Sequence, residues 1–76
     1  MDTIFIYGVY SGDAHYSAED DVWYGRVLYI DDLVSYEAVA PDRLETEFRL
    51  SVNDYLRFCA AHHKTPQTSL TMKGAA

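Results

Sequence analysis

The chain has 76 residues, 49% of them hydrophobic and 14% aromatic, which is typical of a globular protein and excludes a disordered one. A chain of this length forms one small domain that buries only about 60% of its unfolded surface, so its core is thin. The net charge of −6 excludes the basic stripe that nucleic-acid binding needs and favours a basic partner.

The first predicted element is an extended segment over residues 3–16, where Ile, Phe, Val and Tyr are frequent. Gly8 and the Ser11-Gly12 pair interrupt this segment, which favours a bulge or a bend over a hairpin. The polar and acidic residues 17–21 then suit the turn of a hairpin.

The second strand is predicted over residues 22–30, with apolar side chains at both odd and even positions. Such a strand is typically central in its sheet and covered on at least one face. Asp31-Asp32 makes a second tight connection, and residues 33–39 form a third strand. Consecutive strands joined by short turns give an antiparallel meander.

One long helix is predicted from Pro41 onwards. Proline suits the first helical position, and Asp42 favours the positive end of the helix dipole. Apolar residues recur at spacings of three and four and form one stripe: Leu44, Phe48, Val52, Tyr55, Leu56 and Cys59. Burying this stripe on the meander gives a two-layer α+β fold, a three-stranded antiparallel meander packed by one long helix (β-β-β-α).

The predicted domain spans residues 1–64. Residues 65–76 are small and polar and are expected to form a flexible tail or, at 69–72, a short fourth strand at the sheet edge. The single cysteine, Cys59, allows no intramolecular disulfide. The apolar run at the N-terminus is too short for a signal peptide or a membrane span. We therefore expect a cytoplasmic protein without membrane association.

Three pieces of sequence follow one another in the order and spacing of a known family. They are residues 7–12 (YGVYSG) with the acidic turn behind them, residues 22–34 (VWYGRVLYIDDLV), and the helix with SVNDYLRFC. Together these pieces resemble the N-terminal domain of HicB-type antitoxins. The resemblance implies a partial ribonuclease-H-like fold and a role in a type II toxin–antitoxin system. The implied partner is a HicA-like toxin, a small basic RNA-cleaving protein whose active surface the antitoxin covers.

Two features depart from the family pattern. Ala40 stands where the family usually has a Ser or Thr that caps the helix. The family usually continues into a ribbon-helix-helix or helix-turn-helix module, whereas here only a short SLTM stretch follows the helix. We therefore expect no direct binding of nucleic acid by this chain.

Catalysis and metal binding are alternatives to this interpretation. Ribonuclease H enzymes hold metal ions with several carboxylates, but the acids of this chain cluster in predicted turns, where solvated acids are ordinary. Cys59, His62 and His63 share one helix end, yet no distant fourth ligand accompanies them, and Cys59 more simply closes the apolar stripe. We expect no enzyme activity, cofactor or metal, with a metal-dependent nuclease as the alternative.

The aromatic residues exceed what a thin core can bury, so some should remain on the sheet surface. Exposed Tyr and Trp favour protein interfaces, although they can also stack across strands as sheet stabilisers. The predicted partner-binding residues are strand aromatics and turn acids: Tyr16, Asp20, Asp21, Trp23, Tyr24, Tyr29, Asp31 and Asp32. A further alternative is a homo-oligomer that associates through an open sheet edge or the aromatic face and has no toxin partner.

Overall fold

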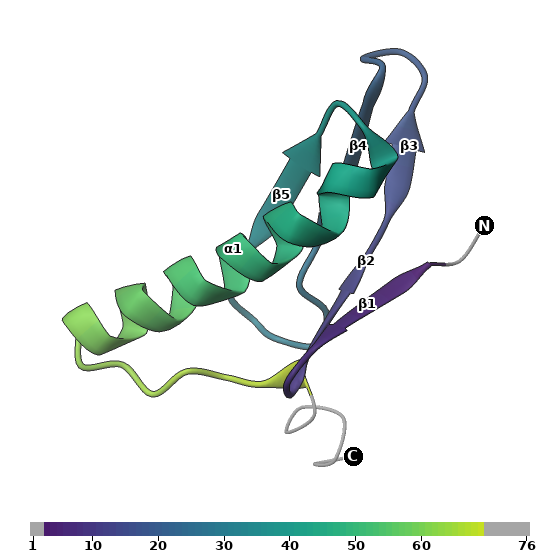
Figure 1. Ribbon diagram of the computed structural model, residues 1–76. Coiled ribbons are helices and arrows are strands. Elements are labelled where there is room, and N and C mark those ends of the chain that lie inside the picture. The colour runs from purple at the N-terminus through teal and green to yellow at the C-terminus, as the bar shows by residue number, and fades with distance from the viewer. Residues whose placement is uncertain (1–2, 70–76) are drawn as a thin grey trace.

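The computed structural model describes residues 3–69, which form five strands and one helix (Figure 1). The elements are β1 (Ile4–Tyr7), β2 (Tyr10–Asp13), β3 (His15–Ser17), β4 (Val22–Arg26), β5 (Ser35–Ala38) and α1 (Pro41–Ala61). β1 pairs with β2, and β3, β4 and β5 form an antiparallel meander in that order. The helix lies across one face of the strands, which confirms the α+β class and the meander packed by one long helix.

A tight hairpin joins β1 to β2, so the predicted bulge or bend at Gly8 was wrong. Tyr7 pairs with Tyr10, which leaves a two-residue loop of Gly8 and Val9. Gly8 has a φ of +63°, the left-handed value that a type II′ turn requires at its first loop position and that glycine adopts without strain. Glycine at the first loop position is itself the signature of a type II′ turn, so Gly8-Val9 between two apolar runs is a signal that the sequence prediction missed.

β2 and β3 lie in line and share one register against the next strand (Figure 1). Gly12 pairs with Val27 and His15 pairs with Tyr24. Both pairs are three residues apart along their strands, so the register is continuous. Between these pairs the strand is interrupted, since β2 ends at Asp13 and β3 begins at His15. There the Arg26 amide donates to the Asp13 carboxylate (2.9 Å), and the Asp13 carbonyl accepts a hydrogen bond from the hydroxyl of Tyr36 (2.6 Å).

β4 and β5 are shorter than predicted. Their pairing ends where the Val27 amide donates to the Val34 carbonyl (2.8 Å). Tyr29 then has a φ of +64°, a left-handed conformation that a regular strand does not accommodate. The apolar residues that suggested a strand to position 30 serve packing instead, since Ile30 lies against the core.

The core lies between the helix and the sheet. The helix contributes the predicted apolar stripe except Leu56, which is exposed, and the sheet contributes three residues. The buried set is Tyr10, Val27, Tyr36, Leu44, Phe48, Val52, Tyr55 and Cys59. Some tyrosines are thus buried and others exposed, as the sequence predicted.

Two glycines make room for Tyr36 in this core. A Cβ atom on Gly12 would lie 2.3 Å from the Tyr36 hydroxyl, and one on Gly25 would lie 1.9 Å from the backbone oxygen of Asp13. Burial, with the nearby Asp13 charge, raises the pKa of Tyr36. The hydroxyl therefore stays protonated, and its hydrogen bond to the Asp13 carbonyl holds the end of β2 near β5.

The two ends of the helix differ in how they are capped. Ala40 occupies the N-cap position without any side-chain hydrogen bond, and Pro41 follows at the first helical position. At the other end His63 has a φ of +53°, and the Lys64 amide donates to the Cys59 carbonyl (2.8 Å). This is the Schellman arrangement.

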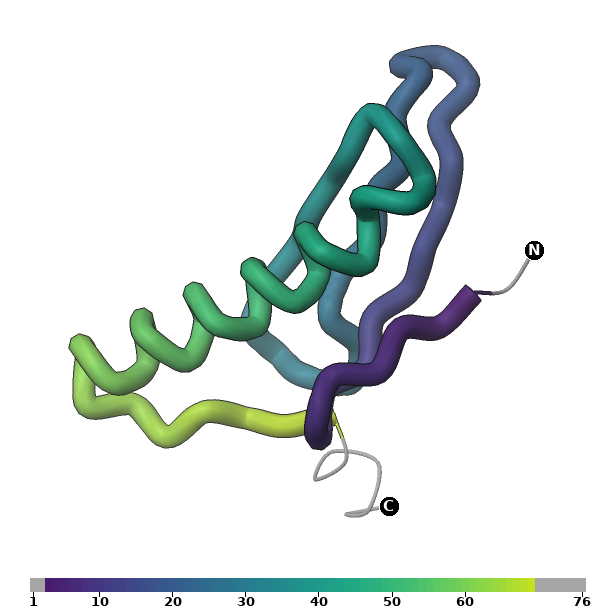
Figure 2. Tube along the Cα trace, viewed as in Figure 1, coloured from purple at the N-terminus to yellow at the C-terminus, as the bar shows by residue number. Residues whose placement is uncertain are grey.

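After the helix, segment 65–69 returns to the strands (Figure 2). The hydroxyl of Ser69, only 2% exposed, accepts the Ser11 amide (3.0 Å) and donates to the Leu28 carbonyl (2.6 Å). It thus links β2 to the residues that follow β4. The first residues of the predicted tail are bonded to the domain, whereas the predicted fourth strand at 69–72 lies almost wholly outside the described residues.

Candidate partner-binding face of the sheet

The sheet face opposite α1 is not covered by any described element. Along β4, Trp23 and Gly25 lie on the helix side, and side chains alternate between faces, so Val22, Tyr24 and Arg26 lie on the other side. The cross-strand pairs extend this open face to β3 and β5. The open face consists of His15, Ser17, Val22, Tyr24, Arg26, Ser35 and Glu37.

Tyr24 lies at the centre of the open face between two grooves. The first groove is lined by five residues of the open face, by Asp20 of the adjoining turn, and by Gly25 and Tyr36; the five are Ser17, Val22, Tyr24, Ser35 and Glu37. The second groove is lined by Asp13, His15, Tyr24, Gly25, Arg26, Leu33 and Ser35. The described residues of the first groove thus include two carboxylates and no cation, whereas the second groove mixes both charges.

A hydrogen bond between His15 and Asp13 fixes the second groove in shape. His15 Nε2 lies 3.0 Å from Asp13 Oδ2, and the imidazole stacks on Tyr24 with 5.3 Å between ring centroids. Burial alone would raise the pKa of Asp13, but hydrogen bonds from His15 and the Arg26 amide outweigh it and lower this pKa. The ionised carboxylate therefore orients His15, and His15 supports one face of Tyr24.

The eight residues predicted to bind a partner lie in three separate places. Tyr24 alone is on the open face, where it is 44% exposed. Four residues belong to the β3–β4 hairpin, and three belong to the β4–β5 connection at the other end of the strands. The hairpin group is Tyr16, Asp20, Asp21 and Trp23, and the connection group is Tyr29, Asp31 and Asp32.

The hairpin group divides between the two faces. Tyr16 and Trp23 stack on the helix side, with 5.0 Å between ring centroids, and Trp23 packs against the core. The Tyr16 hydroxyl donates to Asp21 Oδ1 (2.7 Å), and this hydrogen bond raises the pKa of Tyr16. Asp20, by contrast, lines the first groove beside Tyr24 and is available to a partner there.

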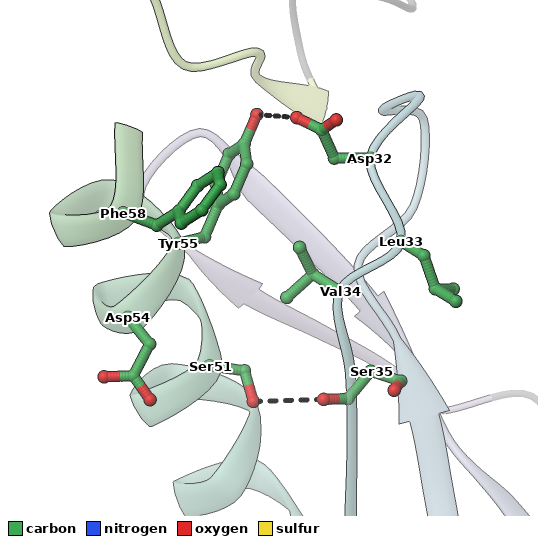
Figure 3. Close-up of a pocket in the computed structure, with 8 residues that line it drawn as sticks. All are labelled: Asp32, Leu33, Val34, Ser35, Ser51, Asp54, Tyr55 and Phe58. Carbon is green, nitrogen blue, oxygen red and sulfur yellow. Dashed lines mark hydrogen bonds between the residues drawn. The ribbon is translucent and has the colours of Figure 1, made fainter. Parts of the chain in front are cut away.

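The acids of the connection group bind residues of this chain. Asp32 accepts hydrogen bonds from Lys64 Nζ (2.6 Å) and from the Tyr55 hydroxyl (2.9 Å), and both lower its pKa. Figure 3 shows the Tyr55 contact. The Asp31 amide donates to the Gln67 side chain (2.7 Å). These acids therefore hold the connection against the segment that follows the helix.

Six of the seven members of the open face were missed by the sequence prediction, among them the three with ionisable side chains: His15, Arg26 and Glu37. The signal that could have found them is strand alternation. Once Trp23 is placed on the helix side, even-numbered residues of β4 and their cross-strand partners must share the other face.

No protein-family model, curated protein or solved structure matches the chain. Across residues 3–69, no helix is both long and apolar enough to cross a membrane. The same residues contain no group of three or more His, Cys, Asp or Glu side chains placed to hold a metal ion. The function is therefore inferred from the sequence pattern and the open face.

Proposed function

We propose that this chain is the toxin-binding domain of a HicB-like antitoxin. It would neutralise a small, basic, HicA-like RNA-cleaving toxin by covering the surface with which that toxin binds RNA. The proposal rests on the three pieces of sequence that resemble the family and on an α+β fold of the expected kind. It assigns the chain a binding role and no catalytic step.

The observation that carries the proposal is Tyr24 beside a groove that contains only acidic charge. A half-exposed tyrosine, held from one side by His15, offers a rigid contact that loses little entropy on binding. Asp20 and Glu37 lie in the adjacent groove, where lysine or arginine side chains of a basic partner can meet them.

The overall charge supports the same partner. A net charge of −6 steers a basic protein towards this chain and speeds the encounter at low salt. An RNA-cleaving toxin needs cations to hold the phosphate backbone. Carboxylates that occupy those cations would compete directly with RNA, so masking requires no change in the toxin's own structure.

The test is to look for a small basic protein in the adjacent reading frames, to co-purify it with this chain and to measure binding by calorimetry. Tyr24→Ala should weaken the complex by about 30-fold or more, the effect of losing a central interface aromatic. Tyr29→Ala is the matched control because Tyr29 is a similarly exposed tyrosine (52%) outside the open face.

Equal losses from the two substitutions would contradict the proposed face. Absence of a complex, together with no suppression of the neighbouring protein's toxicity, would reject the proposed function itself. Asp20→Asn combined with Glu37→Gln should slow association and reduce its dependence on salt, since these carboxylates attract the partner before contact.

A further inference from the structure

Strand β5 is an edge strand, with β4 as its only neighbour among residues 3–69. The Val27 amide donates to the Val34 carbonyl, and hydrogen-bonded pairs alternate along an antiparallel ladder. The backbone groups of Tyr36 and Ala38 therefore point towards β4. Those of Ser35 and Glu37 point away from it, towards the edge that another strand can take. The Ser35 carbonyl there accepts a long hydrogen bond from the Ser51 hydroxyl (3.4 Å), which a pairing strand would replace.

This edge has only part of the usual protection. Natural edge strands are kept very short, carry charges (lysine above all) or proline, contain a bulge, or are covered by a neighbouring element. β5 is short and carries one charge, Glu37, but its sequence SYEA contains no lysine or proline. Leu33 and Val39 flank it and are the most exposed large hydrophobic residues of the described chain, at 80% and 86%.

We propose that β5 pairs with β5 of a second copy of this chain, antiparallel and about a twofold axis at Tyr36. In this register Leu33 lies opposite Val39 of the second copy, and Val39 lies opposite Leu33 of the second copy. The contact between Leu33 and Val39 thereby occurs twice, once on each side of the twofold axis, as an isologous interface requires.

The charges select this register over its neighbour. With the axis at Tyr36, Ser35 lies opposite Glu37 of the second copy. Moving the axis to Glu37 would place the two glutamates directly opposite each other, and like charges in that position destabilise a sheet. A self-complementary pattern of this kind fits a second copy of the same strand better than an unrelated peptide.

The surface beside the edge leaves room for this pairing. A groove runs between the helix and the residues leading into β5, and its lining includes Val34, Ser51, Tyr55 and Phe58 (Figure 3). Ala38 of the second copy would lie opposite Val34, beside the half-exposed ring of Phe58. The two sheets would become continuous, with both helices on one face and both open faces still uncovered.

Sedimentation equilibrium of the full chain from micromolar to millimolar concentration tests the dimer. The expected result is a reversible monomer–dimer equilibrium. Ser35→Lys places a cation opposite Glu37 twice in each dimer and should tighten it by about 2- to 30-fold. Ser35→Glu should loosen the dimer by a similar factor.

Thr46→Lys and Thr46→Glu are the matched controls, because Thr46 is an exposed helix residue outside β5 and its groove, and the charge changes are the same. A strict monomer at every concentration, or equal effects at positions 35 and 46, would overturn the proposal. Tyr24→Ala should leave the dimer constant unchanged, so failure of this interface and failure of toxin binding can be told apart.

Discussion

Asp13 links the interior of this protein to its open face. Its carboxylate accepts the Arg26 amide and pairs with His15, while its carbonyl accepts the Tyr36 hydroxyl. Asp13 thus accepts a hydrogen bond from the backbone of β4, orients the imidazole beside Tyr24 and accepts the hydrogen bond of the buried Tyr36 hydroxyl. Changes at Asp13 should therefore affect both stability and the shape of the candidate site.

The pH dependence of stability provides a test of this role. The pKa of Asp13 is lowered from its ordinary 3.8, because the hydrogen bonds outweigh the effect of burial. A carboxyl with a lowered folded-state pKa stabilises the fold above its unfolded-state pKa, and this contribution is lost as the pH falls from there through the folded-state value.

We expect the wild type to lose more free energy of unfolding than Asp13→Asn between about pH 5 and about pH 2. Urea denaturation at a series of pH values measures the difference. Glu19→Gln, in the exposed hairpin turn, serves as the control. Parallel pH curves for the wild type and Asp13→Asn would show that the carboxylate has no special role.

The helix is the element whose stability can be raised most simply. Ala40 already has the extended backbone of an N-cap residue (φ −127°, ψ 139°), but it has no side-chain acceptor for the free amides of the first turn. Ala40→Ser supplies a hydroxyl oxygen for the amide of Asp42, or for that of Arg43, which donates to the Ala40 carbonyl (3.1 Å). The expected gain is about 0.5–2 kcal/mol in the free energy of unfolding.

Chemical denaturation measures this gain as a shift of the midpoint at constant slope. Ala60→Ser, at an exposed position near the end of the helix, introduces the same side chain without a capping role and should be neutral or slightly destabilising. No difference between the two variants would mean that the first turn is satisfied in some other way.

The helix was also the element best predicted from the sequence. Its stripe of spaced apolar residues is a periodic signal that depends on no other part of the chain. The left-handed Tyr29 depends on a single backbone angle, which the neighbouring residue types do not specify, whereas the turn at Gly8 had a signal in its glycine that the prediction did not use. The β4–β5 pairing was therefore predicted correctly in order but extended too far.

The candidate site was predicted less completely, for a similar reason. Alternation assigns residues to two faces of a strand but does not say which face the helix covers. Tyr24 and Trp23 looked equivalent in the sequence, and the structure places them on opposite sides. Likewise, the bonds of Asp32 to Tyr55 and Lys64 join segments far apart in the chain, and no local pattern predicts them.

At the scale of the whole molecule, Ser69 joins the segment after the helix to β2 and to the residues that follow β4. Its buried hydroxyl accepts a hydrogen bond from the Ser11 amide and donates one to the Leu28 carbonyl. Ser69→Ala leaves both backbone groups without this partner and should cost about 1–3 kcal/mol. Denaturation measures the loss.

Hydrogen exchange at the Ser11 amide should also become faster in Ser69→Ala, because that amide loses its acceptor. Thr65→Ala, at an exposed position of the same segment, is the control and should change neither quantity. Unchanged exchange at Ser11 would show that the bridge is not formed in solution.

The two-sided arrangement of the β4 aromatics has a practical consequence. The single tryptophan of the chain, Trp23, stacks on Tyr16 on the helix side, while Tyr24 occupies the open face. Indole fluorescence therefore reports whether hairpin and helix remain in contact. A ligand on the open face approaches the other side of the sheet, so emission from one native residue distinguishes unfolding from binding without an added label.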